Sequence, residues 1–239
     1  MLFMKPVKRM LLILLLWTIQ VSVAAATSNP HIDSLYETLD SLLAHQSTII
    51  ELKKQRIRTY QNGLRQLRLT PEQQFHVNNQ LYDEYLAFNF DSALYYIRQN
   101  VESPQRLHHP DSIAASLIRM SHILAVSGLF DKASQMLRQI PLRQLSVDNQ
   151  VAYYNQCAEL SLYRSEMASH SPFYQDYIDS LLHHRDQILQ LAPRGSYDDV
   201  FNRSTQLGER GQVDEGIRLL DELLHRYRQG DRQYKGFCC

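Results

Sequence analysis

Apolar residues recur at helical spacing along nearly the whole chain, and no stretch shows the sustained alternation of a half-buried strand. The eight Gly and eight Pro residues lie mostly between these amphipathic stretches, where they end one helix and begin the next. The pattern predicts an all-α protein with one long helix over residues 27–69, followed by about four pairs of helices over residues 70–229.

A short phrase recurs where the second helix of a pair begins: an aromatic or branched residue, Asp, any residue and a very small residue. It reads Phe90-Asp91-Ser92-Ala93, then Phe130-Asp131-Lys132-Ala133, then Val213-Asp214-Glu215-Gly216. The first interval is 40 residues and the second is 83, so one unit without the phrase fits between. Repetition at this period is typical of stacked helical hairpins that cover each other's apolar faces, which predicts a helical-hairpin solenoid.

The N-terminal helix is predicted to start at Asn29-Pro30, a capping residue followed by Pro at the first helical position. Acidic residues lie early in it and basic residues late, which suits the helix dipole. At 1.5 Å per residue, its length is on the order of 55 Å. It either pairs with a second copy as a coiled coil or lies along the array as a cap. Polar residues on the seam weaken any pairing, namely Gln46, Lys53 and Arg56.

Residues 1–26 have the layout of a secretory signal peptide: three basic residues, an apolar run from Met10 to Val23, and the small residues Ala24 to Ala26. The run is shorter than the roughly 20 residues that cross a bilayer. We expect cleavage after Ala24 or Ala26 and an exported, periplasmic protein, with an uncleaved membrane anchor as the alternative. Without its three basic residues the chain has 22 basic and 25 acidic residues, a net charge of −3, which gives no reason to expect nucleic-acid binding.

The sequence contains no motif for catalysis, metal binding or a cofactor. The adjacent pairs His108-His109 and His183-His184 point about 100° apart on a helix and do not share a face, and no His-Glu-x-x-His is present. Gly-x-Ser-x-Gly and glycine-rich phosphate loops are also absent. We therefore expect a non-enzymatic protein with no metal and no cofactor. Cys157, on an apolar helical face, is expected to be a core residue.

At its repeated phrase the chain resembles the tetratricopeptide repeat, whose second helix opens with an aromatic, an acid and a small residue. The small residue expected twelve positions earlier is Ser121 in the second unit and Ser204 in the fourth, whereas the first unit departs with Leu81. The resemblance implies that the first helix of each hairpin lines a concave groove that binds a protein or peptide. The groove positions carried over from the family are Asn78, Asn79, Tyr82, Arg119, His122 and Asn202.

The order of segments also resembles an uncharacterised family of Bacteroidota envelope proteins. The similar segments are the signal peptide, Leu39-Asp40-Ser41-Leu42-Leu43, the Tyr85 to Tyr96 repeat, and Tyr177 to Leu191 before Ala192-Pro193. Members carry a domain of unknown function, are sometimes labelled transcriptional regulators, and continue into more repeats, one membrane span and a cytoplasmic helical segment. The resemblance implies that this chain is the exported N-terminal half, that residues 230–239 are a truncated tail, and that only a missing span or an uncleaved signal would attach it to a membrane.

These inferences predict a periplasmic protein- or peptide-binding sensor or scaffold that forms part of an envelope signalling or regulatory protein. Two alternatives stay open. A glycan-uptake binding protein usually carries a lipid-anchor Cys after the signal and exposed Trp platforms; the only Trp here is Trp17, inside the predicted signal peptide. A purely structural dimeric spacer would self-associate through the first helix.

Overall fold

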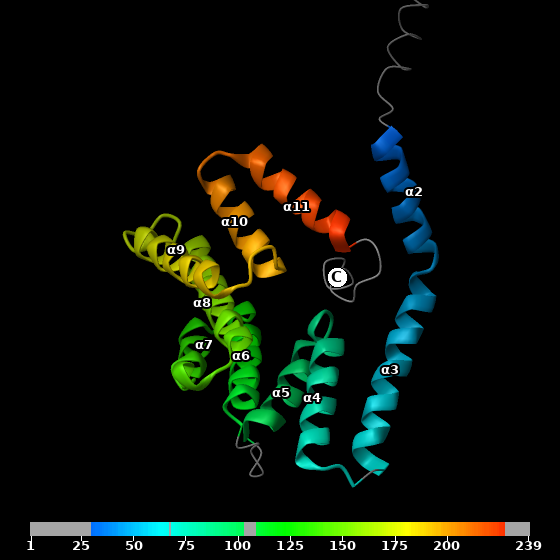
Figure 1. Ribbon diagram of the computed structural model, residues 1–239. Coiled ribbons are helices and arrows are strands. Elements are labelled where there is room, and N and C mark those ends of the chain that lie inside the picture. The colour runs from blue at the N-terminus through cyan, green and yellow to red at the C-terminus, as the bar shows by residue number, and fades with distance from the viewer. Residues whose placement is uncertain (1–29, 67, 103–108, 228–239) are drawn as a thin grey trace, which may run out of the picture. The chain divides into compact units, whose positions relative to one another are not determined.

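The computed structural model describes residues 30–66, 68–102 and 109–227, and all regular secondary structure in these ranges is helical (Figure 1). The all-α prediction is therefore confirmed. The predicted signal peptide (1–26) and tail (230–239) lie outside the described residues. The helices are α2 (Pro30–Ala44), α3 (Gln46–Gln66), α4 (Pro71–Leu86), α5 (Phe90–Glu102), α6 (Pro110–Val126), α7 (Phe130–Leu137), the 3-10 turn η1 (Leu142–Gln144), α8 (Val147–Met167), α9 (Tyr174–Leu191), α10 (Tyr197–Glu209) and α11 (Val213–Tyr227).

The chain divides into two units, residues 1–58 and 59–239. In the first unit, the single long helix predicted from the sequence is two helices, α2 and α3, that meet at His45. The His45 ring Nδ1 lies 2.7 Å from the carbonyl oxygen of Ser41. The backbone N–H of His45 also lies within hydrogen-bond distance of the carbonyl oxygens of Ser41 and Leu42, both at 3.2 Å. The interruption is short, because the backbone N–H of Ile49 still donates to the carbonyl of His45 at 3.1 Å.

In the second unit, four hairpins follow one another along the chain: α4 packs against α5, α6 against α7, α8 against α9, and α10 against α11 (Figure 1). Each hairpin contacts the next, through α5 and α6, through α6, α7 and α8, and through α9 and α10. An ion pair between the buried Arg185 of α9 and Glu209 of α10 joins the last two hairpins. The solenoid assignment depends on the prediction that each hairpin stacks on its neighbour in the chain. This prediction is confirmed.

Local sequence signals account for where these helices begin. Thr70 closes a capping box with Gln73 ahead of α4, in which each side chain accepts from the other's backbone N–H. Ser196 likewise accepts from the backbone N–H of Asp199 at the start of α10. Gly128 and Gly211, with φ of 77° and 78°, take the left-handed conformation that ends α6 and α10 and turns the chain toward its partner helix.

The small residue of the repeated phrase marks where the two helices of a hairpin come closest. Ala93 and Ala133 are completely buried. A Cβ added to Gly216 would lie 2.7 Å from the backbone oxygen of Ser204, the residue that the repeat pattern places opposite it. The phrase therefore records a steric requirement of the hairpin.

Apolar clusters run across the hairpin boundaries. One joins residues of α6, α7 and α8 and includes Cys157, and a second joins α4, α5 and α6. A third lies inside the third hairpin, between α8 and α9. Cys157 is thus a core residue, as its position predicts. Within the described ranges, no helix combines the length and apolarity needed to cross a membrane.

Candidate functional site

The first helices of the four hairpins, α4, α6, α8 and α10, are joined in succession by polar side chains. Between α4 and α6, the Tyr82 hydroxyl donates to the backbone oxygen of Arg119 at 3.2 Å. The Arg119 guanidinium lies 6.0 Å from the centroid of the Tyr82 ring and 3.8 Å from Oδ1 of Asp83. The side chains of Arg119 and Asp83 are 34% and 53% exposed, so this pair of opposite charges is open to solvent.

Between α6 and α8, Nδ1 of His122 lies 2.9 Å from Oε2 of Glu159, and the Tyr163 hydroxyl donates to Oε1 of the same carboxylate at 3.1 Å. The side chains of His122 and Glu159 are 28% and 33% exposed. Burial acts to raise the pKa of the Glu159 carboxyl, but the His122 and Tyr163 hydrogen bonds outweigh it and hold that pKa below its usual value. Glu159 is therefore a carboxylate at neutral pH, fixed in position from both sides.

Between α8 and α10, the Asn155 amide donates to Oδ1 of Asp198 at 2.6 Å. The Asn202 amide donates to the backbone oxygen of Asp198 at 2.9 Å and reaches Oδ1 of Asn155 at 3.4 Å. All three junctions between first helices thus carry directional polar contacts. We refer to the residues that make them as the polar row: Tyr82, Asp83, Arg119, His122, Asn155, Glu159, Asp198 and Asn202.

Four of the six residues predicted to line a groove belong to the polar row: Tyr82, Arg119, His122 and Asn202. Of these, Tyr82 and Asn202 are buried, whereas Arg119 and His122 are partly exposed. The hydrogen-bonding groups of Tyr82 and Asn202 are used between neighbouring helices. Contact of any of the six with a partner stays a prediction.

Asn78 and Asn79, the other two predicted groove residues, are buried inside the first hairpin. The Asn78 amide donates to Oδ1 of Asn100 on α5 at 2.8 Å, and the Asn100 amide donates to Oδ1 of Asn79 at 3.1 Å and to the Phe75 backbone oxygen at 3.2 Å. These three Asn side chains form a network that holds α4 to α5. It uses the amide NH2 of Asn78 and Oδ1 of Asn79 inside the hairpin.

The sequence reasoning missed Asp83, Asn155, Glu159 and Asp198. Asn155 and Glu159 lie in the hairpin that lacks the repeated phrase, so the sequence offers no fixed point from which to count their positions. Asp83 directly follows Tyr82 and Asp198 lies in the first turn of α10, where an acid is also explained by the helix dipole.

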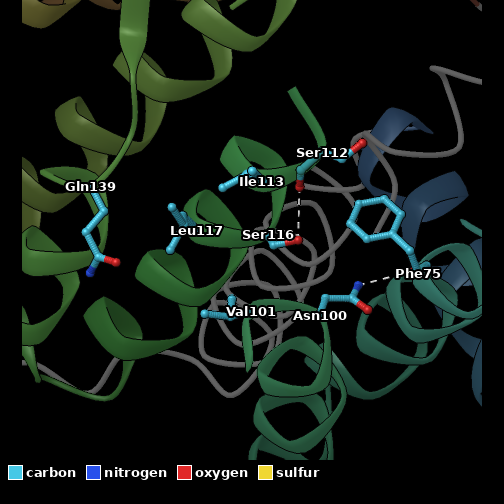
Figure 2. A pocket seen from close by; sticks show the side chains of 8 residues that line it. All are labelled: Phe75, Asn100, Val101, Ser112, Ile113, Ser116, Leu117 and Gln139. Carbon is cyan, nitrogen blue, oxygen red and sulfur yellow. Dashed lines mark hydrogen bonds between the residues drawn. The ribbon is translucent and has the colours of Figure 1, made fainter. Parts of the chain in front are cut away.

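A pocket of about 90 Å³ lies between the first and second hairpins, next to this Asn network (Figure 2). It is lined by Phe75, Asn100, Val101, Ser112, Ile113, Ser116, Leu117 and Gln139. Small-molecule sites usually span about 300–1,000 Å³, so this space suits a few water molecules and is too small for a cofactor.

The described residues contain no cluster of three or more His, Cys, Asp or Glu side chains arranged to hold a metal ion. Burial raises the pKa of the Cys157 thiol to about 11, although a hydrogen bond with Tyr153 acts in the opposite direction. At neutral pH this thiol is protonated and so is a poor nucleophile.

The chain matches a family model that is described as the SusR N-terminal TPR domain. It covers residues 43–239, which include the last residues of α2, all of α3 and all four hairpins. No curated protein and no solved structure matches the chain significantly.

Proposed function

Because this chain belongs to the SusR N-terminal TPR domain family, we propose that it is a non-enzymatic repeat module that binds a protein or peptide partner. It serves as the periplasmic sensor or scaffold part of an envelope signalling or regulatory protein. Tetratricopeptide-type domains generally mediate contacts between proteins, which supports the binding role. The signal-peptide pattern of residues 1–26 supports the location.

The polar row carries this proposal, because it presents charged groups of both signs that are held in place yet partly open to solvent. Arg119 and Asp83 form an exposed ion pair in which Nε of Arg119 lies 3.8 Å from Oδ1 of Asp83. Such a pair contributes about 0–1 kcal/mol, so a carboxylate of the partner can replace Asp83 with little loss. The planar guanidinium of Arg119 is suited to two-point recognition of that carboxylate.

Next along the row, His122 and Glu159 provide the complementary element. Glu159 accepts hydrogen bonds and can face a basic or N–H group of the partner, while Tyr163 keeps its carboxylate oriented. Both charged sites are positioned by contacts within the protein before any partner arrives. Ordering them in advance reduces the entropy lost on binding. The row therefore fits a partner segment with an acidic group followed by a basic or amide group.

The test is capture of partners in the cell envelope by the full chain and two charge-reversal variants. Arg119→Glu changes the row, and Arg98→Glu makes the same change at an exposed position on the second helix α5. Circular dichroism first establishes that both variants keep their helix content. We expect Arg119→Glu to lose partners, identified by mass spectrometry, that Arg98→Glu retains. An identical partner set for both variants would remove the polar row as the binding surface.

Location is tested separately, by fractionating cells and sequencing the N-terminus of the exported chain. An N-terminus at Ala25 or Thr27 in the periplasmic fraction is the expected result. A chain found in the cytoplasm with Met1 retained would contradict the periplasmic role and leave the binding experiment unaffected.

A further inference from the structure

The helices α2 and α3 present a long apolar face to solvent. Nine large apolar side chains between residues 32 and 52 are each 43–62% exposed: Ile32, Leu35, Tyr36, Leu39, Leu42, Leu43, Ile49, Ile50 and Leu52. Their three- and four-residue spacing places most of them on one face. Soluble monomers rarely expose a contiguous apolar patch of this kind, and most of the stability of helices in proteins comes from packing of their apolar face.

Charge along the same segment is divided by sign. From residue 32 to 44 the charged residues are Asp33, Glu37 and Asp40, a net of −3. From residue 46 to 58 the basic residues are Lys53, Lys54, Arg56 and Arg58 against the single acid Glu51, a net of +3. The two halves meet at the interruption around His45. The segment is therefore complementary in charge to a copy of itself that runs in the opposite direction.

We propose that residues 32–58 pair with the same segment of a second copy of this chain in an antiparallel arrangement, with the two-fold axis near His45. In a parallel pair, the acidic halves would lie side by side and so would the basic halves, and like charges at that distance repel. The antiparallel pair places each acidic half beside a basic half and covers both apolar faces. This self-complementarity favours a second copy over an unrelated helix.

The area exposed by these side chains agrees with that arrangement. Nine side chains about half exposed amount to on the order of 700 Å² per copy, so two copies bury an area near the roughly 1,200–2,000 Å² of stable interfaces. The polar seam residues Gln46 and Lys53 lower the stability of a coiled coil but help to fix its register and orientation. The pairing residues are distinct from those of the polar row, so the inference does not depend on the proposed partner binding.

The relative orientation of the two copies determines which introduced cysteines can cross-link. With the axis near His45, Leu39 of one copy lies opposite Ile50 of the other, while the two Leu39 residues are about 16 Å apart at 1.5 Å per residue. A disulfide requires Cα atoms within about 7 Å. An antiparallel pair thus joins position 39 to position 50, and a parallel pair joins each position to itself.

The experiment uses the full chain with Cys238 and Cys239 changed to Ser; Cys157 is buried. Leu39→Cys and Ile50→Cys are expressed singly and also together, on two differently tagged copies, and then oxidised. We expect a cross-linked dimer that contains both tags, and little cross-linking in either single variant. Efficient cross-linking of each single variant to itself would establish a parallel pair and overturn the proposal. No cross-link in any combination, with a monomer mass by light scattering, would also overturn it and assign this face to another occupant.

A second measurement tests the role of charge. Asp33→Lys combined with Asp40→Lys makes both halves basic, and Asp221→Lys combined with Glu222→Lys makes the same change at exposed positions on α11. The first variant loses charge pairs across the interface, which should raise the dimer dissociation constant about tenfold. The second variant should leave the dissociation constant unchanged. Equal effects of the two variants would refute pairing by complementary halves. Arg119→Glu should dimerise as the unaltered chain does, which separates this inference from the proposed function.

Discussion

Substitution of Gly216 by Ala tests the steric meaning of the repeated phrase. The added Cβ would lie 2.7 Å from the backbone oxygen of Ser204, a group that cannot rotate away, and 3.7 Å from Cβ of Leu207. Overpacking of this kind destabilises a protein by about 1–3 kcal/mol. Ala is favoured over Gly within a helix by about 1 kcal/mol, which partly offsets the clash. The net expectation is a loss of about 0–2 kcal/mol in the free energy of unfolding.

Gly63→Ala is the matched control, because Gly63 lies inside α3 and a Cβ there meets no atom within 4 Å. This variant should gain up to about 1 kcal/mol, so the two variants should differ by about 1–3 kcal/mol. Urea denaturation of the full chain, followed by circular dichroism, measures both. If Gly216→Ala is stabilised as much as Gly63→Ala, the helices of the last hairpin do not approach most closely at this residue, and the steric interpretation of the phrase is wrong.

Three further outcomes are expected. Asn100→Ala removes the centre of the network with Asn78 and Asn79 and should destabilise the chain by about 1–3 kcal/mol in urea, whereas Gln99→Ala at the neighbouring exposed position should change little. Burial, and to a lesser degree the neighbouring His183, lowers the pKa of His184. The folded chain thus disfavours protonation of His184, and the thermal midpoint should fall as the pH drops below about 6.5. This fall should be less steep in His184→Gln, whereas the control His170→Gln should show the same fall as the unaltered chain. Finally, because Trp17 is the only Trp, the mature chain should show tyrosine emission alone, and a tryptophan band would mean that residues 1–26 are retained.

The fold could be predicted from the sequence because helical hairpins are specified locally. Apolar spacing sets each helix, and Pro and capping residues set the helix starts. The position of Ser204 opposite Gly216 was implied by the resemblance to the tetratricopeptide repeat. The interruption at His45 was not predicted, because the apolar spacing continues through it and no Gly or Pro marks it. The third hairpin lacks the phrase and fits the interval between the second and fourth units.

The groove positions stay predictions, since helical periodicity cannot separate a polar residue that faces a groove from one that faces a neighbouring helix. Asn78 and Asn79 satisfied the groove spacing, yet both bond to Asn100, which lies on the other helix of the hairpin. Arg119 and His122 are partly exposed, and each contacts an acidic residue of a neighbouring first helix.

The two kinds of contact between hairpins differ in what they contribute. The clusters that join α4 to α6 and α6 to α8 supply apolar burial, which stabilises the stack but is not directional. A pair as exposed as Arg119–Asp83 adds little stability. Stability therefore does not explain why this charged pair occupies the junction between α4 and α6. The directional contacts of the Arg119–Asp83 and His122–Glu159 pairs can fix the rotation of one hairpin on the next, and their accessible charges can meet a partner. A ligand that engages Arg119 or Glu159 would therefore act on the same groups that align adjacent hairpins.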